Sequence, residues 1–112
     1  MVLNEQWKNE FLAVFTEAKF LHEGGYNYVY IPNHTMPEGC TPAVTPLLLC
    51  VGPKDGYDSR LYFPQPITGP VARNWNSNVY VLDRTWHSIS WRTQPGLDYL
   101  EMLMVNLRAF KK

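Results

Sequence analysis

The densest cluster of polar and aromatic side chains lies between Asp83 and Trp91. Within it His87 stands beside Ser88, and a histidine that removes a hydroxyl proton is a general base that activates the oxygen as a nucleophile. Asp83 could orient the imidazole ring, as the carboxylate of a catalytic triad does. Asp83, His87 and Ser88 are therefore the candidate catalytic residues.

The alternative interpretation of this segment is structural. Adjacent residues of an extended chain point to opposite faces, so the histidine and the serine need not meet. Trp86 and Trp91 would then pack against the last helix, and Asp83 would form a salt bridge with Arg84. For each residue taken alone, we favour this interpretation.

The same segment could also bind a partner protein. Exposed tryptophan and arginine side chains often anchor protein interfaces, which makes Arg84, Trp86 and Trp91 candidate binding residues. Asn76, one of three alternating asparagines, could supply an amide that stabilises an oxyanion, although asparagines in such stretches usually serve turns. We expect function to concentrate between Arg73 and Trp91.

The chain has two cysteines, and we expect both to be reduced thiols without a catalytic role. Neither belongs to a CxxC motif, and a secreted domain of this size often has more cysteines, so a disulfide is the less favoured alternative. Cys50 lies in the apolar run Leu47–Val51, where a thiol behaves as a small hydrophobe. Cys40 lies in a loop, with no basic neighbour to stabilise a thiolate.

Composition excludes several classes of function. Lys+Arg and Asp+Glu both total 10, so the chain lacks the net positive field of a nucleic-acid-binding protein. Its longest apolar run, Leu47–Val51, is far shorter than the roughly 20 residues of a membrane helix, and Glu5 and Glu10 argue against a signal peptide. The three histidines lack metal-site spacing. We expect a cytoplasmic protein with no nucleic-acid or membrane partner, no metal and no cofactor.

The elements that position these residues begin with a predicted helix over about 4–22. Asn4 is a good N-cap, and Gly24-Gly25 would end the helix. Its apolar stripe has helical spacing and consists of Trp7, Phe11, Val14, Phe15, Ala18 and Leu21.

Runs rich in β-branched and aromatic residues predict strands over 26–31, 44–51 and 59–63. Short connections between them indicate an antiparallel meander. Residues 64–78 are predicted to be irregular, with a plausible fourth strand over 78–82. A final helix begins near Pro95, a residue type suited to a first turn.

This order predicts a single α+β domain over residues 1–112, with an N-terminal helix, a three- to four-stranded antiparallel meander, an irregular segment and a C-terminal helix. The order is also that of the ubiquitin-conjugating-enzyme (UBC) fold. Over about residues 24–110 the chain resembles the prokaryotic ubiquitin-conjugating-enzyme-like family E. The resemblance is carried by Tyr28–Pro32, Met36–Gly39, Thr45–Val51, Gly56–Asp58, Leu61–Phe63, Leu82–Trp86 and Trp91.

The resemblance implies partners and a pathway. Members of this family are typically encoded beside an adenylating activating enzyme, a JAB-type metalloprotease and ubiquitin-like proteins, and antiphage defence is one role for such an operon. The implied partners are therefore a ubiquitin-like protein and its activating enzyme.

One departure from conventional conjugating enzymes matters for mechanism. Those enzymes carry a thioester cysteine after the fourth strand, behind a His-Pro-Asn motif, whereas this chain has neither beyond Cys50. The chain is then either a non-catalytic docking subunit or an enzyme that transfers the ubiquitin-like protein through a hydroxyl. A third alternative is an unrelated small α+β protein-interaction domain without catalytic activity.

Overall fold

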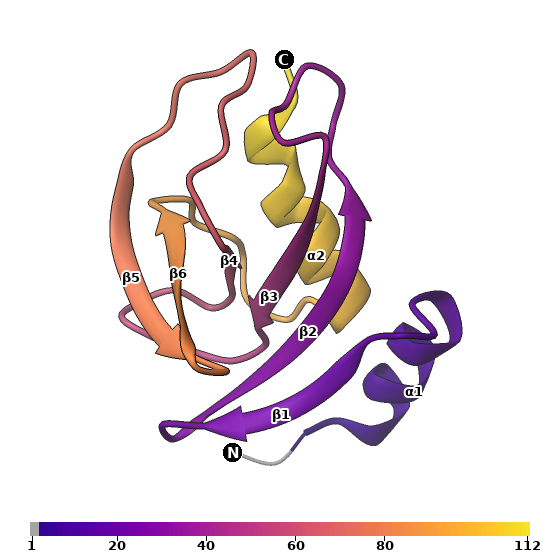
Figure 1. Cartoon of the computed structure of the whole chain (residues 1–112). Coiled ribbons are helices and arrows are strands. Elements are labelled where there is room, and N and C mark those ends of the chain that lie inside the picture. The colour runs from indigo at the N-terminus through magenta and orange to yellow at the C-terminus, as the bar shows by residue number, and fades with distance from the viewer. Residues whose placement is uncertain (1–2) are drawn as a thin grey trace.

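A computed structural model describes residues 3–112, which form an α+β structure with two α-helices and one six-stranded antiparallel sheet (Figure 1). None of the described helices is long and apolar enough to span a membrane. The elements in chain order are α1 (Glu5–Val14), β1 (Lys19–Glu23), β2 (Tyr26–Thr35), β3 (Val44–Cys50), β4 (Arg60–Phe63), β5 (Trp75–Val81), β6 (Arg84–Ile89), α2 (Tyr99–Leu107) and a short 3-10 helix, η1 (Arg108–Phe110).

The first helix begins as predicted but is shorter. The Asn4 side chain accepts a hydrogen bond from the Trp7 N–H at 3.0 Å, which caps α1. The prediction of helix up to residue 22 was wrong, because Lys19–Glu23 forms β1 and pairs with β2. Gly24 and Gly25 both have positive φ, so they form the two-residue turn of a β-hairpin instead of ending a helix.

The strand order is β1-β2-β3-β4-β6-β5, and every neighbouring pair is antiparallel. The antiparallel arrangement is confirmed, whereas the predicted number of strands was too small. The irregular segment ends earlier than predicted, because β5 already starts at Trp75. No strand was predicted over residues 84–89, which form β6 and pair with β4.

The turn between β5 and β6 explains why this hairpin was missed. Leu82 and Asp83 both adopt positive φ, at 54° and 59°, which is the conformation of a tight hairpin turn. Asn-Gly or Asp-Gly is the usual sequence at such a turn, and leucine rarely adopts this backbone conformation. The sequence therefore carried no recognisable hairpin signal.

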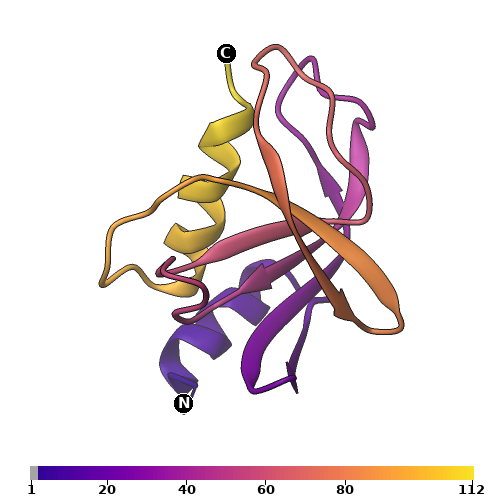
Figure 2. The same ribbon diagram turned by 90° about the vertical axis from the view of Figure 1, so that its left-hand side faces the viewer.

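The C-terminal helix covers one face of the sheet. It starts at Tyr99, four residues after Pro95, behind a capping box in which Asp98 and Glu101 each accept the other's backbone N–H. Figure 2 shows both helices to one side of the sheet. The larger hydrophobic core lies between this face and the helices.

A second, smaller core lies on the opposite face of the sheet. It consists of Tyr28, Leu48, Cys50, Tyr62, Val81 and Trp86, and we call this side the second face. Leu47 and Leu49 of β3 belong to the larger core, while Leu48 and Cys50 belong to the smaller one. Burial on both faces explains why β3 is a continuous apolar run instead of an alternating one.

Candidate functional site

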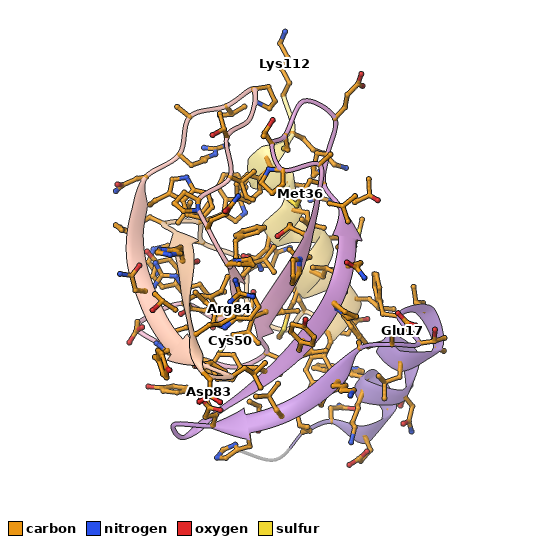
Figure 3. The ribbon with its side chains drawn as sticks, in the orientation of Figure 1. Glu17, Met36, Cys50, Asp83, Arg84 and Lys112 are labelled. Carbon is orange, nitrogen blue, oxygen red and sulfur yellow. The ribbon has the colours of Figure 1, made fainter. Side chains whose placement is uncertain are left out.

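The two thiols are buried. Cys40 and Cys50 are free cysteines with 6% and 0% of their surface exposed. Cys50 is labelled in Figure 3. The Cys40 thiol donates to the Phe110 carbonyl at 3.7 Å, and the Cys50 thiol donates to the Gly52 carbonyl at 3.6 Å. Burial raises the pKa of both thiols. Neither side chain is therefore placed to act as a thiolate nucleophile.

The structure does not bring the candidate catalytic residues together. Asp83 lies in the hairpin turn (Figure 3), whereas His87 and Ser88 are neighbours within β6 and point to opposite faces. The His87 Nδ1 atom lies 3.0 Å from the Asn78 side-chain oxygen, and the Ser88 hydroxyl donates to the Leu61 carbonyl at 2.7 Å. These contacts do not join the three residues into a triad.

The two tryptophans pack within the domain, on different faces. Trp91 donates its indole N–H to the Val105 carbonyl of α2 at 3.0 Å, as the structural interpretation predicted. Trp86 was expected against the same helix, but it is fully buried on the second face and donates to the Val81 carbonyl at 2.9 Å. Trp86 therefore presents no surface to a partner.

The expected salt bridge between Asp83 and Arg84 is not formed. Among residues 3–112 the only ion pair joins Lys54 and Asp55. The exposed Arg84 guanidinium instead lies 5.3 Å from the centre of the Trp86 ring. Arg84 thus remains an exposed cation on the hairpin.

Asn76 belongs to a polar cluster that the sequence did not reveal. We call it the Arg60 cluster, and its members are Tyr57, Arg60, Asn76, Ser88, Ser90 and Arg92. Arg60 opens β4 and is the only charged residue of the run from Ser59 to Phe63. A lone charge at the start of a strand ordinarily faces solvent, and its partners here come from segments 16 and 28 residues away. No local pattern could have predicted the cluster.

Arg60 is buried without a carboxylate partner. Only 4% of its surface is exposed, and it makes no ion pair within the part of the chain that the structure describes. Its guanidinium donates to the Ser88 hydroxyl at 3.3 Å, to the Asn76 side-chain oxygen at 3.3 Å and to the Ile89 carbonyl at 3.2 Å. All three acceptors are neutral, so they accept hydrogen bonds from the guanidinium without compensating its charge.

Arg60 fixes the direction of every hydrogen bond around it, because a guanidinium can only donate. The Asn76 oxygen must face Arg60, so the Asn76 amide nitrogen faces Ser90 and donates to its hydroxyl oxygen. The Ser90 hydroxyl proton then has no acceptor among residues 3–112 and points to solvent. Ser90 is exposed and therefore offers a donor to an external ligand.

The same directions disfavour Ser88 as a nucleophile. Its hydroxyl oxygen accepts from a cation, which withdraws electron density, and its proton is held by the Leu61 carbonyl. Only 1% of the residue is exposed. An activated serine needs a base for its proton and a path to the substrate, and Ser88 has neither.

A second guanidinium contacts the same aromatic ring as the first. Arg92 is exposed and donates to the Gly56 carbonyl at 2.8 Å, and its guanidinium lies 4.8 Å from the centre of the Tyr57 ring. The Arg60 guanidinium lies 4.2 Å from the centre of the same ring. One aromatic ring therefore anchors two positive charges, since cations are attracted to its π-face.

The charged groups of the Arg60 cluster are suited to the binding of an anion. They are guanidiniums, which bind anions and do not exchange protons at ordinary pH. Within residues 3–112, no group of three or more His, Cys, Asp or Glu side chains is arranged to hold a metal ion. Comparison of the chain with protein-family models, with curated proteins and with solved structures finds no match.

Proposed function

We propose that this chain is a ubiquitin-conjugating-enzyme-like protein of a bacterial ubiquitin-like conjugation pathway and acts in it as a non-catalytic docking subunit. The burial of both thiols carries the second half of this proposal. A conjugating enzyme must expose a thiolate to receive the activated protein, and here burial opposes both exposure and ionisation.

The family assignment is supported by the sequence resemblance and by the order of the elements. A helix, an antiparallel meander, an irregular connection and a helix packed on one face occur in the order of the UBC fold. The β5–β6 hairpin, which lies between the irregular connection and α2, is an addition to the expected order. The resembling stretches Tyr28–Pro32, Thr45–Val51 and Leu61–Phe63 fall mainly on β2, β3 and β4, which are neighbours in the sheet.

A docking role agrees better with the polar groups than transfer through a hydroxyl does. Ser88 is buried, and the exposed Ser90 receives a hydrogen bond from an amide, which cannot accept its proton. Thr85 is exposed and has no histidine or carboxylate bonded to it in the described part of the chain. None of these hydroxyls has the adjacent base that would activate it.

The proposed partners are a ubiquitin-like protein and its adenylating activating enzyme. The two free thiols fit a reducing compartment, so a cytoplasmic location belongs to the same proposal. The docking subunit would hold the ubiquitin-like protein while the activating enzyme supplies the chemistry.

The test combines the purified chain with the ubiquitin-like protein and activating enzyme encoded beside its gene, together with ATP. We expect co-elution with the ubiquitin-like protein in size-exclusion chromatography and no covalent adduct on a denaturing gel. An adduct that dithiothreitol removes would assign a thioester to Cys40 or Cys50 and refute the docking role.

Two other outcomes would also refute parts of the proposal. An adduct that resists thiols, yields to hydroxylamine and disappears on substitution of Thr85, Ser88 or Ser90 would assign transfer through a hydroxyl. Failure to bind either partner would favour an unrelated protein-interaction domain.

A further inference from the structure

We propose that the Arg60 cluster binds a carboxylate group of a partner protein. The identity of that partner as the ubiquitin-like protein rests on the proposed function. The carboxylate chemistry itself rests on the geometry of the cluster.

The first argument is the uncompensated charge of Arg60. A buried cation is costly unless an anion accompanies it, and this one has only neutral acceptors within 3.5 Å. Asp58, two residues earlier in the chain, is exposed and forms no ion pair with it in the described residues. The position for a counter-anion is therefore left to a ligand.

The second argument is the set of donors at the surface of the cluster. The exposed Arg92 offers a planar fork of N–H groups that matches the two oxygens of a carboxylate. Ser90 offers the hydroxyl proton that Asn76 leaves free. Arg60 is buried and contacts the same Tyr57 ring as Arg92. A buried charge is screened less by water, which strengthens its attraction for an anion.

The third argument is the way these donors are held in place. The Arg92 guanidinium is held by its hydrogen bond to the Gly56 carbonyl and by its contact with the Tyr57 ring. Asn76 is fixed by Arg60 and Ser90. Donors that are already ordered lose little entropy when a ligand binds, which favours recognition of even a small group.

The test uses fluorescein-labelled tetraglycine with a free C-terminal carboxylate, and the same peptide as its C-terminal amide, in fluorescence anisotropy titrations at about 0.15 M salt. The acid peptide should bind about tenfold or more tightly than the amide, since charge-assisted hydrogen bonds are roughly twice as strong as neutral ones. Arg92→Gln should remove about tenfold of that affinity, and Ser90→Ala should weaken it several-fold.

Arg108→Gln is the matched control. Arg108 is also an exposed arginine, so its loss changes the net charge in the same way, but it lies in η1 and outside the Arg60 cluster. It should leave the affinity for the acid peptide within about twofold of wild type, because distant surface charges are largely screened. Equal losses in Arg108→Gln and Arg92→Gln would indicate a non-specific charge effect and overturn the site.

Other results would also overturn the inference. Equal affinity for the acid and amide peptides would show that the protein does not recognise the carboxylate. Inorganic phosphate that displaces the acid peptide at lower concentration than acetate, at matched ionic strength, would assign a phosphate ligand instead.

The intact ubiquitin-like protein separates this inference from the proposed function. If it binds wild type and Arg92→Gln equally, the docking function stands and the carboxylate site is wrong. If tetraglycine binds through its carboxylate and the ubiquitin-like protein does not bind, the site stands and the proposed function is wrong.

Discussion

Replacement of Trp86 tests whether the β5–β6 hairpin is a structural element packed on the sheet or an exposed binding surface. The Trp86 side chain is fully buried on the second face, where it packs near the Tyr30 ring at 6.1 Å and donates its N–H to Val81. A tryptophan buries roughly 150–250 Å², which corresponds to about 4–6 kcal/mol as an upper estimate. Measured losses for truncation of large buried aromatic residues are about 3–5 kcal/mol.

We therefore expect Trp86→Ala to lower the free energy of unfolding by about 4 kcal/mol, a large fraction of the roughly 5–15 kcal/mol of a typical domain. At roughly 4 °C per kcal/mol, the melting temperature should fall by about 16 °C. Trp86→Phe keeps most of the volume but removes the hydrogen bond from the indole N–H to the Val81 carbonyl, so it should cost about 1–2 kcal/mol.

The assay is equilibrium unfolding in urea, followed by far-ultraviolet circular dichroism. Tyr80→Ala is the matched control, because Tyr80 is an aromatic residue of the same hairpin with 66% of its surface exposed. It should change stability by no more than about 0.5 kcal/mol. A loss below about 1 kcal/mol for Trp86→Ala would refute the packing of this hairpin and restore Trp86 as a candidate for partner binding.

Buried and half-buried groups give further tests. The Tyr62 hydroxyl is buried and makes no hydrogen bond of ordinary geometry among the described residues, although the Lys54 ammonium interacts with it. Tyr62→Phe should therefore raise the free energy of unfolding in urea by about 1 kcal/mol, and an equal loss would show that the hydroxyl is bonded. Burial lowers the pKa of His34 below 6.5, so the unfolded chain takes up its proton first on acidification, and stability should fall from pH 7 to pH 5. His34→Gln should flatten that slope, and identical slopes in the two proteins would contradict the reasoning. Because burial raises the pKa of both thiols, disulfide-exchange labelling of native Cys40 and Cys50 at pH 8 should be on the order of tenfold slower than in urea, and rapid native labelling of either single-cysteine variant would refute this.

The fold class was predictable because the strongest patterns were unambiguous. The run Leu47–Val51 is apolar and has the length of a strand, and all but its last residue lies in β3. Asn4 was predicted to be the N-cap of the first helix, and it caps α1 in the structure. The prediction of a helix over residues 15–22 was wrong because Phe15, Ala18 and Leu21 continue the apolar stripe at helical spacing. The pairing of β1 with β2 decides their conformation, and the hydrogen bonds of a hairpin are not visible in a periodicity.

The candidate site was predictable only in part. The segment from Arg73 to Trp91, where we expected function to concentrate, includes Asn76 and Ser88, but Arg60, which donates to both, lies on another strand. The register of β4 against β6 brings Arg60 close to Ser88, since Tyr62 pairs with Ser88 across the sheet. Pairing of β4 with β6 skips β5, and no property of the individual residues indicates that order.

Native mass spectrometry of the chain with the ubiquitin-like protein, the activating enzyme and ATP tests the docking role most directly. The account predicts a non-covalent complex in the native spectrum, with the chain recovered at its unmodified mass after acid denaturation. It also predicts that Arg92→Gln weakens this complex and Arg108→Gln does not. A denatured species with the combined mass of the chain and the ubiquitin-like protein, less one water, would show a covalent bond between them and contradict the account.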